Sequence, residues 1–342
     1  TSLEALKDPR SGLLSPEPDA VSEAYGWSVP RRLEFARTIH ERSVSGSEAS
    51  RLWAEAIAAI EASPRYIDLK FTPQLGLLPI GVDPDSELWE FAHLQTGEPA
   101  VRGADGRLVL TEATGLVLVL IPAGTFWMGA QSTDPNGRNF DPQAEGNESP
   151  VHEVTLSAHF LAKHETTQGQ WLRLSGGNPS RYQGGKIART LLHPVEQVSW
   201  HESVEWTRRI GLSLPSEAQW EHGARGGTDT PWWTGLERES LRGKVNLADQ
   251  TAKKGGAPWS DINDWPDLED GIVVHSEVGR YAANRFGLHE VAGNLWEWCL
   301  DGWGGYSAAP STDPVASAAG SANRVSRGGS FYLAASFARS AY

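Results

Sequence analysis

From Gly129 onwards, short apolar runs alternate with long polar loops such as residues 130–150 and 250–271. The 342-residue chain has 36 glycines, 21 prolines and 15 tryptophans, so turns and large flat rings are unusually frequent. Glycine and proline favour turns, and a tryptophan ring buries a wide area wherever the chain brings it. Long loops inside a compact domain are usually functional or held by metal ions. This pattern predicts a β-rich domain with many irregular segments that pack around aromatic rings.

Net charge and apolar runs exclude two classes of partner. The formal net charge of −13 argues against non-specific nucleic-acid binding, which needs clustered Lys and Arg. The longest apolar run, residues 115–122 (GLVLVLIP), has the length of a strand and is too short to span a membrane. No signal-peptide pattern is present, and the single cysteine, Cys299, allows no intramolecular disulfide. We expect a cytoplasmic monomer whose natural N-terminus lies upstream of Thr1.

Helical signals dominate the first part of the chain and return three times later. Residues 49–62 are rich in helix formers, follow the candidate N-cap Ser47 and precede Pro64. The apolar residues on one face of this helix are Leu52, Ala56, Ile57 and Ile60. Further helices are predicted over 165–176 and 200–211, and a third from the N-cap Ser216 to Gly226.

Several separated phrases of the sequence are similar to one known family and occur in that family's order. They include IPAGTFWMGA (121–130), LSLPSEAQWEHGARGG (212–227), NRFGLHEVAGNLWEWCLDGW (284–303) and NRVSRGGSF (323–331). Together they resemble the formylglycine-generating enzyme (sulfatase-modifying factor) family. The resemblance implies an α+β architecture, a variant C-type lectin fold over residues 112–342. Residues 1–111 would then form an N-terminal extension of helices and short strands.

The resemblance also implies two structural calcium ions. The first would be held by Asn246 and the carbonyl of Leu247, with Asp270 and the carbonyl of Ile272. The second would be held by Glu290, the carbonyls of Gly293 and Leu295, and Glu297. Oxygen ligands from loops suit a hard cation. Glu290 stands where the family usually has Asn, and the alternative is that these are loop acids facing water.

The family's catalytic residues are missing from this chain. The resemblance implies oxidation of a substrate cysteine by two active-site cysteines that hold copper. The corresponding positions carry Leu333 and Ala338, and neither side chain can form a thiolate or bind a soft metal. Cys299 lies in a scaffold phrase and is expected to be a buried, inert thiol. We therefore expect no catalytic residues and no copper.

The last 16 residues, RGGSFYLAASFARSAY, depart from relatives in a systematic way. Many bacterial relatives have Asn or Asp at the positions of Tyr332, Leu333, Phe337 and Tyr342, where this chain has large apolar or aromatic residues. This pattern is similar to that of the variable proteins of diversity-generating retroelements. Such elements copy a template repeat while mutating adenines, which turns Asn codons into Tyr, Phe, Leu and others.

These departures predict a ligand-binding surface at the C-terminal end. Tyr and Phe offer a large contact area for few frozen torsions. The residues expected on this surface are Tyr332, Leu333, Phe337, Tyr342, Phe331, Trp303 and Tyr306. The partner would be a protein or another surface ligand. The alternative is an aromatic core strand after the Gly328–Gly329 turn, although Phe331 and Tyr332 would then face opposite sides.

Three functions remain open from the sequence. The leading one is a non-catalytic ligand-binding protein, the variable protein of a diversity-generating retroelement. The second is a metal-dependent oxidase of the formylglycine-generating type with a rearranged site. The third is a pseudoenzyme sensor domain of a bacterial signalling protein.

Overall fold

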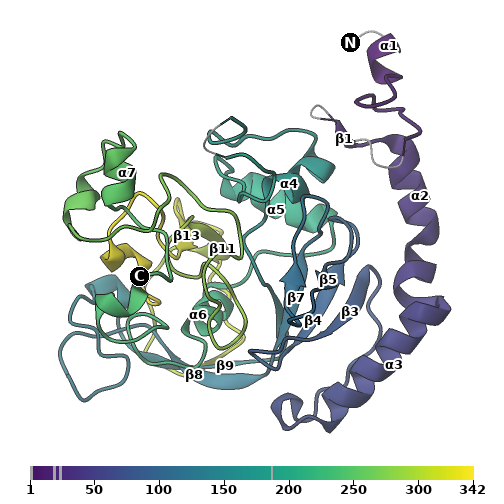
Figure 1. Cartoon of the computed structure of the whole chain (residues 1–342). Coiled ribbons are helices and arrows are strands. Elements are labelled where there is room, and N and C mark those ends of the chain that lie inside the picture. The colour runs from purple at the N-terminus through teal and green to yellow at the C-terminus, as the bar shows by residue number, and fades with distance from the viewer. Residues whose placement is uncertain (1–2, 18–20, 23–24, 186–187) are drawn as a thin grey trace. The chain divides into compact units, whose positions relative to one another are not determined.

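The computed structural model describes residues 3–17, 21–22, 25–185 and 188–342, drawn in Figure 1. The chain divides into two compact units. Unit 1 contains Thr1–Leu120, Thr166–Gln183 and Thr190–Val198, and unit 2 contains Ile121–Glu165, Gly184–Arg189 and Ser199–Tyr342. None of the helices in the described ranges combines the length and the apolar character needed to cross a membrane.

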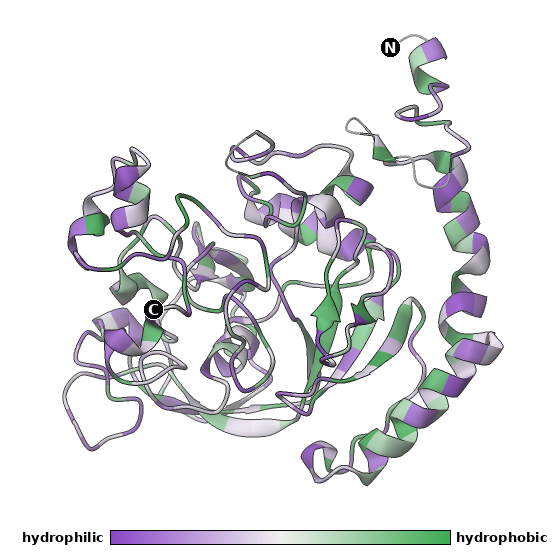
Figure 2. Ribbon diagram, viewed as in Figure 1, coloured by the Kyte–Doolittle hydropathy of each residue, from purple (hydrophilic) through white to green (hydrophobic). Residues whose placement is uncertain are grey.

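The helices of unit 1 are α1 (Leu3–Leu6), α2 (Val29–His40), α3 (Ser47–Ala62) and α4 (Gln168–Ser175), with short turns at Glu41–Ser45 and Pro64–Tyr66. The predicted helix over 49–62 is confirmed as α3, and Ala56 and Ile60 are buried on its inner face. Figure 2 shows this helix alternating between hydrophobic and hydrophilic residues. The expected cap is wrong by one position, because Ser47 is already helical and Gly46 occupies the N-cap.

The sheet of unit 1 contains β3 (Leu77–Val82), β4 (Trp89–His93) and β7 (Val117–Ile121) in antiparallel pairing. Two small pairs accompany it: β1 (Val21–Ser22) with β2 (Gly26–Trp27), and β5 (Val101–Arg102) with β6 (Leu108–Val109). Trp53 of α3 lies 5.8 Å from the Phe71 ring and 5.5 Å from the Phe91 ring, which closes an aromatic core.

The strands of unit 2 are short. A three-stranded sheet has the order β12 (Ser311–Thr312), β9 (His152–Leu156), β8 (Gly124–Met128). β11 (Glu297–Gly302) pairs antiparallel with β13 (Arg324–Arg327), and β10 (His159–Ala162) follows β9. Short 3-10 turns occur at Gly146–Glu148, Arg238–Leu241, Ser260–Asn263 and Ala335–Ala338.

The helices of unit 2 are α5 (Trp200–Arg209), α6 (Glu217–Arg225) and α7 (Gln250–Lys254). Ser199 and Ser216 are N-caps whose side chains accept from the backbone N–H three residues on, as expected for this residue type. Gly226 ends α6 in the left-handed region at φ 54°. The helix that the sequence predicts from Ser216 to Gly226 is therefore confirmed.

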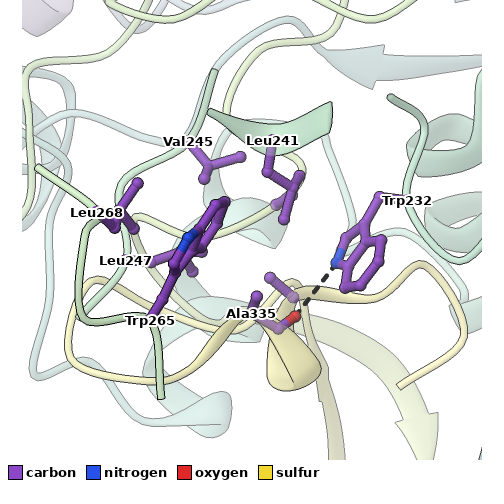
Figure 3. Packing of buried hydrophobic residues seen from close by; sticks show 9 residues of the cluster. Trp232, Leu241, Val245, Leu247, Trp265, Leu268 and Ala335 are labelled. Atoms are coloured by element: carbon purple, nitrogen blue, oxygen red, sulfur yellow. Dashed lines mark hydrogen bonds between the residues drawn. The ribbon is translucent and has the colours of Figure 1, made fainter. Parts of the chain in front are cut away.

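Part of the core of unit 2 lies directly under the C-terminal segment. Figure 3 shows the buried cluster, which contains Trp232, Leu241, Val245, Leu247, Trp265, Leu268, Ala292, Ala335 and Ala338. The indole Nε1 of Trp232 donates to the carbonyl of Ala335 at 3.2 Å. The ring thus packs in the core and fixes the backbone of the C-terminal segment.

Candidate functional site

The C-terminal segment, residues 327–342, leaves the sheet at a double-glycine turn. β13 ends at Arg327, and Gly328 and Gly329 have φ of 93° and 72°. A Cβ on Gly329 would lie 2.8 Å from the carbonyl oxygen of Phe337, so only glycine fits there. The core strand that the sequence left as an alternative is not formed after this turn. The chain instead folds back on itself through the 3-10 turn Ala335–Ala338. The close approach of the Gly329 and Phe337 backbones makes this reversal possible.

Arg327 anchors the start and the end of this segment. Its guanidinium is 3% exposed and donates to Glu221 Oε2 at 2.5 Å and to Glu217 Oε1 at 3.3 Å. It also donates to the carbonyls of Ser340 and Ala341 at 2.8 and 2.9 Å. One side chain on β13 therefore holds the last residues of the chain against α6.

Arg339 forms a second anchor on the loop before β9. It is 2% exposed, donates to Glu148 through two nitrogens at 2.8 Å each, and donates to Asp141 at 2.6 Å. Its Nε donates to the carbonyl of Ser336 at 2.7 Å. Asp141 and Glu148 are themselves buried, so the pairing with Arg339 compensates two carboxylates that would otherwise lack a counter-charge.

Four of the residues expected on the binding surface reach solvent. Tyr332 is 38% exposed, and Leu333, Phe337 and Tyr342 are half-buried. They belong to two aromatic groups. The Tyr332 ring lies 6.2 Å from Trp259, and the Tyr342 ring lies 5.1 Å from Phe337 and 6.2 Å from Trp296.

Two residues expected on this surface pack against the core, Phe331 buried and Tyr306 half-buried, and the prediction is corrected for Phe331. Phe331 is 5% exposed, makes edge contacts with Trp259 at 5.2 Å and His275 at 5.9 Å, and its N–H donates to the Asn294 carbonyl. Tyr306 is half-buried against Met128, Val154 and Leu156, and its hydroxyl donates to Glu217 at 2.8 Å. Both rings serve as packing residues.

Trp303 is 54% exposed but lies away from the turn. In the β11–β13 ladder Glu297 pairs with Arg327, next to the double glycine, whereas Gly302 pairs with Arg324 at the other end. The ladder length separates Trp303 from the Gly328–Gly329 turn. Trp303 therefore follows the far end of the ladder from the turn, and its place on the C-terminal surface stays a prediction.

Of the two positions at which the resemblance places the family's cysteines, Ala338 is buried and Leu333 is half-buried. Ala338 is 2% exposed and belongs to the buried cluster of Figure 3. The carbonyl of Leu333 accepts from the N–H of Ala248 at 3.0 Å. Cys299 is fully buried on β11, and burial raises the pKa of its thiol well above its ordinary value. That environment disfavours the reactive thiolate.

The residues of the first predicted calcium set lie close together. Asp270 Oδ2 accepts from the N–H of Leu247 at 3.3 Å, and its Oδ1 accepts from the N–H of Ile272 at 2.8 Å. Asn246 is 1% exposed and donates through Nδ2 to the carbonyl of Val274 at 2.8 Å. Burial raises the pKa of Asp270 to about 7, and the Asp249 carboxylate adds to this.

A further carboxylate, that of Glu165, lies beside the second predicted set, and the sequence analysis did not identify it. Glu290, which has φ 52°, is buried, and burial raises the pKa of both Glu290 and Glu297 to about 7. Burial and the Glu297 and Glu290 carboxylates raise the pKa of Glu165 well above its ordinary value. Glu165 Oε1 also accepts from the N–H of Leu295 at 2.9 Å. Glu165 lies just before the N-cap of α4 in the phrase KHETTQGQW. Its place in this family phrase is the feature of the sequence that could have identified it.

The donor set matches a hard cation in chemistry, because every candidate atom is an oxygen. Among the residues that the structure describes, no three His, Cys, Asp or Glu side chains converge closely enough to hold a metal by themselves. The predicted sets differ from such a cluster because four of their eight ligands are backbone carbonyls, of Leu247, Ile272, Gly293 and Leu295. The calcium sites stay a prediction.

This chain is similar to one family of proteins. The sulfatase-modifying factor enzyme 1-like domain matches residues 110–342. The formylglycine-generating enzyme of Thermomonospora curvata is 30% identical over 267 residues, covering 63% of this chain and 82% of that protein.

Two solved structures share the fold. Treponema denticola variable protein 1 aligns with a TM-score of 0.53 and 21% identity, covering 68% of this chain and 90% of that chain. PvdO from Pseudomonas aeruginosa aligns with a TM-score of 0.52 and 22% identity, covering 71% and 91%. The domain match, the related enzymes and the shared C-type lectin fold lead to one conclusion: the chain belongs to the sulfatase-modifying factor (formylglycine-generating enzyme) family.

Proposed function

We propose that this chain is a non-catalytic ligand-binding protein, the variable protein of a diversity-generating retroelement. The observation that carries the proposal is the C-terminal segment itself. Where the family's enzymes need two cysteines it has Leu333 and Ala338, and it turns Tyr332, Leu333, Phe337 and Tyr342 toward solvent. In this proposal, a surface that contacts a ligand occupies the region where the family's enzymes have their catalytic site.

The division of this segment into anchors and displayed side chains supports the proposal. Arg327 and Arg339 are 3% and 2% exposed and bind carboxylates on other elements, and Ala334, Ala335 and Ala338 are also buried. Such anchors hold the backbone whatever side chain occupies the solvent-facing positions. A rigid aromatic surface loses little conformational entropy on binding.

The fold shared with Treponema denticola variable protein 1 also supports the proposal. A fold does not by itself assign a function, and the related enzymes share it too. The displayed residues therefore carry the argument. The partner we propose is a protein or another surface ligand, whose identity differs between diversified copies.

We also propose that calcium stabilises the loops beneath this surface. Asn246, Asp270 and the carbonyls of Leu247 and Ile272 would hold one ion. Glu290, Glu297 and the carbonyls of Gly293 and Leu295 would hold the other, with Glu165 beside them. Buried carboxylates that raise each other's pKa would be relieved by a divalent cation.

An oxidase assay tests the enzymatic alternative. The purified chain, loaded with copper, is given a cysteine-containing sulfatase peptide while oxygen uptake and peptide mass are followed. The Thermomonospora curvata enzyme serves as the positive control. We expect no turnover above buffer, and formation of an aldehyde product by this chain would overturn the proposal.

A displayed library tests the binding function and separates it from a sensor pseudoenzyme. Positions 332, 333, 337 and 342 are randomised together and the library is selected on hen egg-white lysozyme as a fixed target. A matched library randomises the buried positions 327, 334, 338 and 339. We expect folded binders from the first library and loss of folded protein from the second. If the first library folds as poorly as the second, the four positions are structural and the proposal fails.

A further inference from the structure

We propose that Trp296, Phe337, Tyr342 and the carboxylate of Glu145 form a recognition site for a positively charged side chain of a protein partner. The inference rests on the proposed function and specifies the chemistry of one part of the surface. An arginine guanidinium, or a lysine ammonium, is the group that this combination of rings and carboxylate suits.

The three rings are arranged around Tyr342. Phe337 meets the Tyr342 ring edge-on, with centroids 5.1 Å apart and an interplanar angle of 87°. Trp296 lies 6.2 Å from the same ring at 37°. All three residues are half-buried, so each ring is packed on one side and reaches solvent on another. A cation is attracted to the negative π faces of such rings, whereas their edges carry partial positive charge.

The charges beside these rings are predominantly negative. Burial raises the pKa of Tyr342, and the nearby Glu145 carboxylate raises it further. Glu145 is exposed at the start of the Gly146–Glu148 turn, where its carboxylate takes part in a capping box. Asp141 and Glu148 lie in the same region.

Arg339 does not cancel this negative charge. Its guanidinium lies over the Tyr342 ring, 5.2 Å from the centroid, so it covers one face of that ring and would repel a second cation if it were alone. It is bound by the Asp141 and Glu148 carboxylates at 2.6 to 2.8 Å, so the buried cluster carries one negative charge in excess, and Glu145 adds another. Arg339 thus orients Tyr342 within a cluster of side chains whose net charge stays negative. This negative charge attracts an incoming cation.

The site has a fixed and a changeable part. Trp296 and Glu145 lie outside residues 327–342, whereas Phe337 and Tyr342 are among the displayed residues. The fixed part would bias diversified copies toward partners with basic surfaces, and the changeable part would decide which of those partners fits.

The test uses two small probes in saturation-transfer NMR with the full chain: acetyl-arginine methylamide and acetyl-citrulline methylamide. Citrulline has nearly the shape of arginine without the charge. We expect the arginine probe to bind in the millimolar range and roughly 5- to 10-fold more tightly than the citrulline probe. Equal affinity for the two probes would overturn the cation site.

Matched variants locate the binding. Tyr342→Ala and Glu145→Gln should each remove most of the preference for arginine, and Tyr342→Phe should keep it because the ring remains. Tyr332→Ala, in the other aromatic group, and Glu205→Gln, an equal change of charge on α5, should leave it unchanged. A preference that survives Tyr342→Ala and Glu145→Gln in folded protein would place the cation elsewhere. Failure here leaves the library selection on lysozyme unaffected, so the two proposals fail separately.

Discussion

Replacing Arg339 should destabilise the protein far more than replacing any displayed residue of the same segment. Arg339→Gln removes the guanidinium that donates to Asp141 at 2.6 Å and to Glu148 at 2.8 Å twice. Both carboxylates are nearly inaccessible, at 2% and 1% exposure, so neither can recover its hydration without unfolding. Breaking a buried pair by removing one partner costs about 3–5 kcal/mol of unfolding free energy.

Urea-induced unfolding at pH 7, followed by far-UV circular dichroism, measures this loss. Tyr332→Ser is the matched control, because Tyr332 is 38% exposed and should change the unfolding free energy by no more than about 0.5 kcal/mol. A loss below about 1 kcal/mol for Arg339→Gln, or a larger loss for Tyr332→Ser, would refute the division into anchors and displayed residues.

Three further changes test other parts of the account. Burial and the adjacent His159 lower the pKa of His222 from 6.5 to about 4, so the unfolded chain binds that proton first as the pH falls. The contribution of His222 to the unfolding free energy should be constant above pH 6.5 and should fall by about 2.5 kcal/mol by pH 4.5. His222→Phe should remove that part of the pH dependence in urea titrations, and an unaltered pH profile would contradict it. EGTA should lower the melting temperature, because an ion held at 100 times its Kd contributes about 2.7 kcal/mol; an unchanged melting curve would dismiss both calcium sites. Gly329→Ala should destabilise by about 1–3 kcal/mol because its Cβ would lie 2.8 Å from the carbonyl oxygen of Phe337, whereas Gly304→Ala, with open space around it, should be neutral in the same assay.

Local signals in the sequence predicted the local structure well. Ser199 and Ser216 begin their helices as N-caps, and Gly226 ends α6, because each depends on residues within one turn. The family that these phrases indicated is confirmed, with a match over residues 110–342. Asp270 bonds the backbones of Leu247 and Ile272, so that predicted set comes together in space.

What the sequence did not reveal depends on contacts between distant residues. Arg339 binds Glu148, 191 positions earlier, and no local pattern identifies that pairing. The turn at Gly329 brings its backbone against Phe337, and the chain folds back there in place of the core strand that the sequence left as an alternative. Phe331 is buried and Tyr332 is exposed because the chain folds back at this point, and only the folded arrangement decides between them.

Sequencing the DNA that flanks the gene in its source organism tests whether this chain is the variable protein of a diversity-generating retroelement. We expect a near-identical copy of the repeat that encodes residues 327–342, together with a reverse-transcriptase gene. The two copies should differ only where the template has adenine, at the codons of Tyr332, Leu333, Phe337 and Tyr342, and agree at Arg327, Gly329 and Arg339. A locus with neither a second copy nor a reverse transcriptase would contradict the claim.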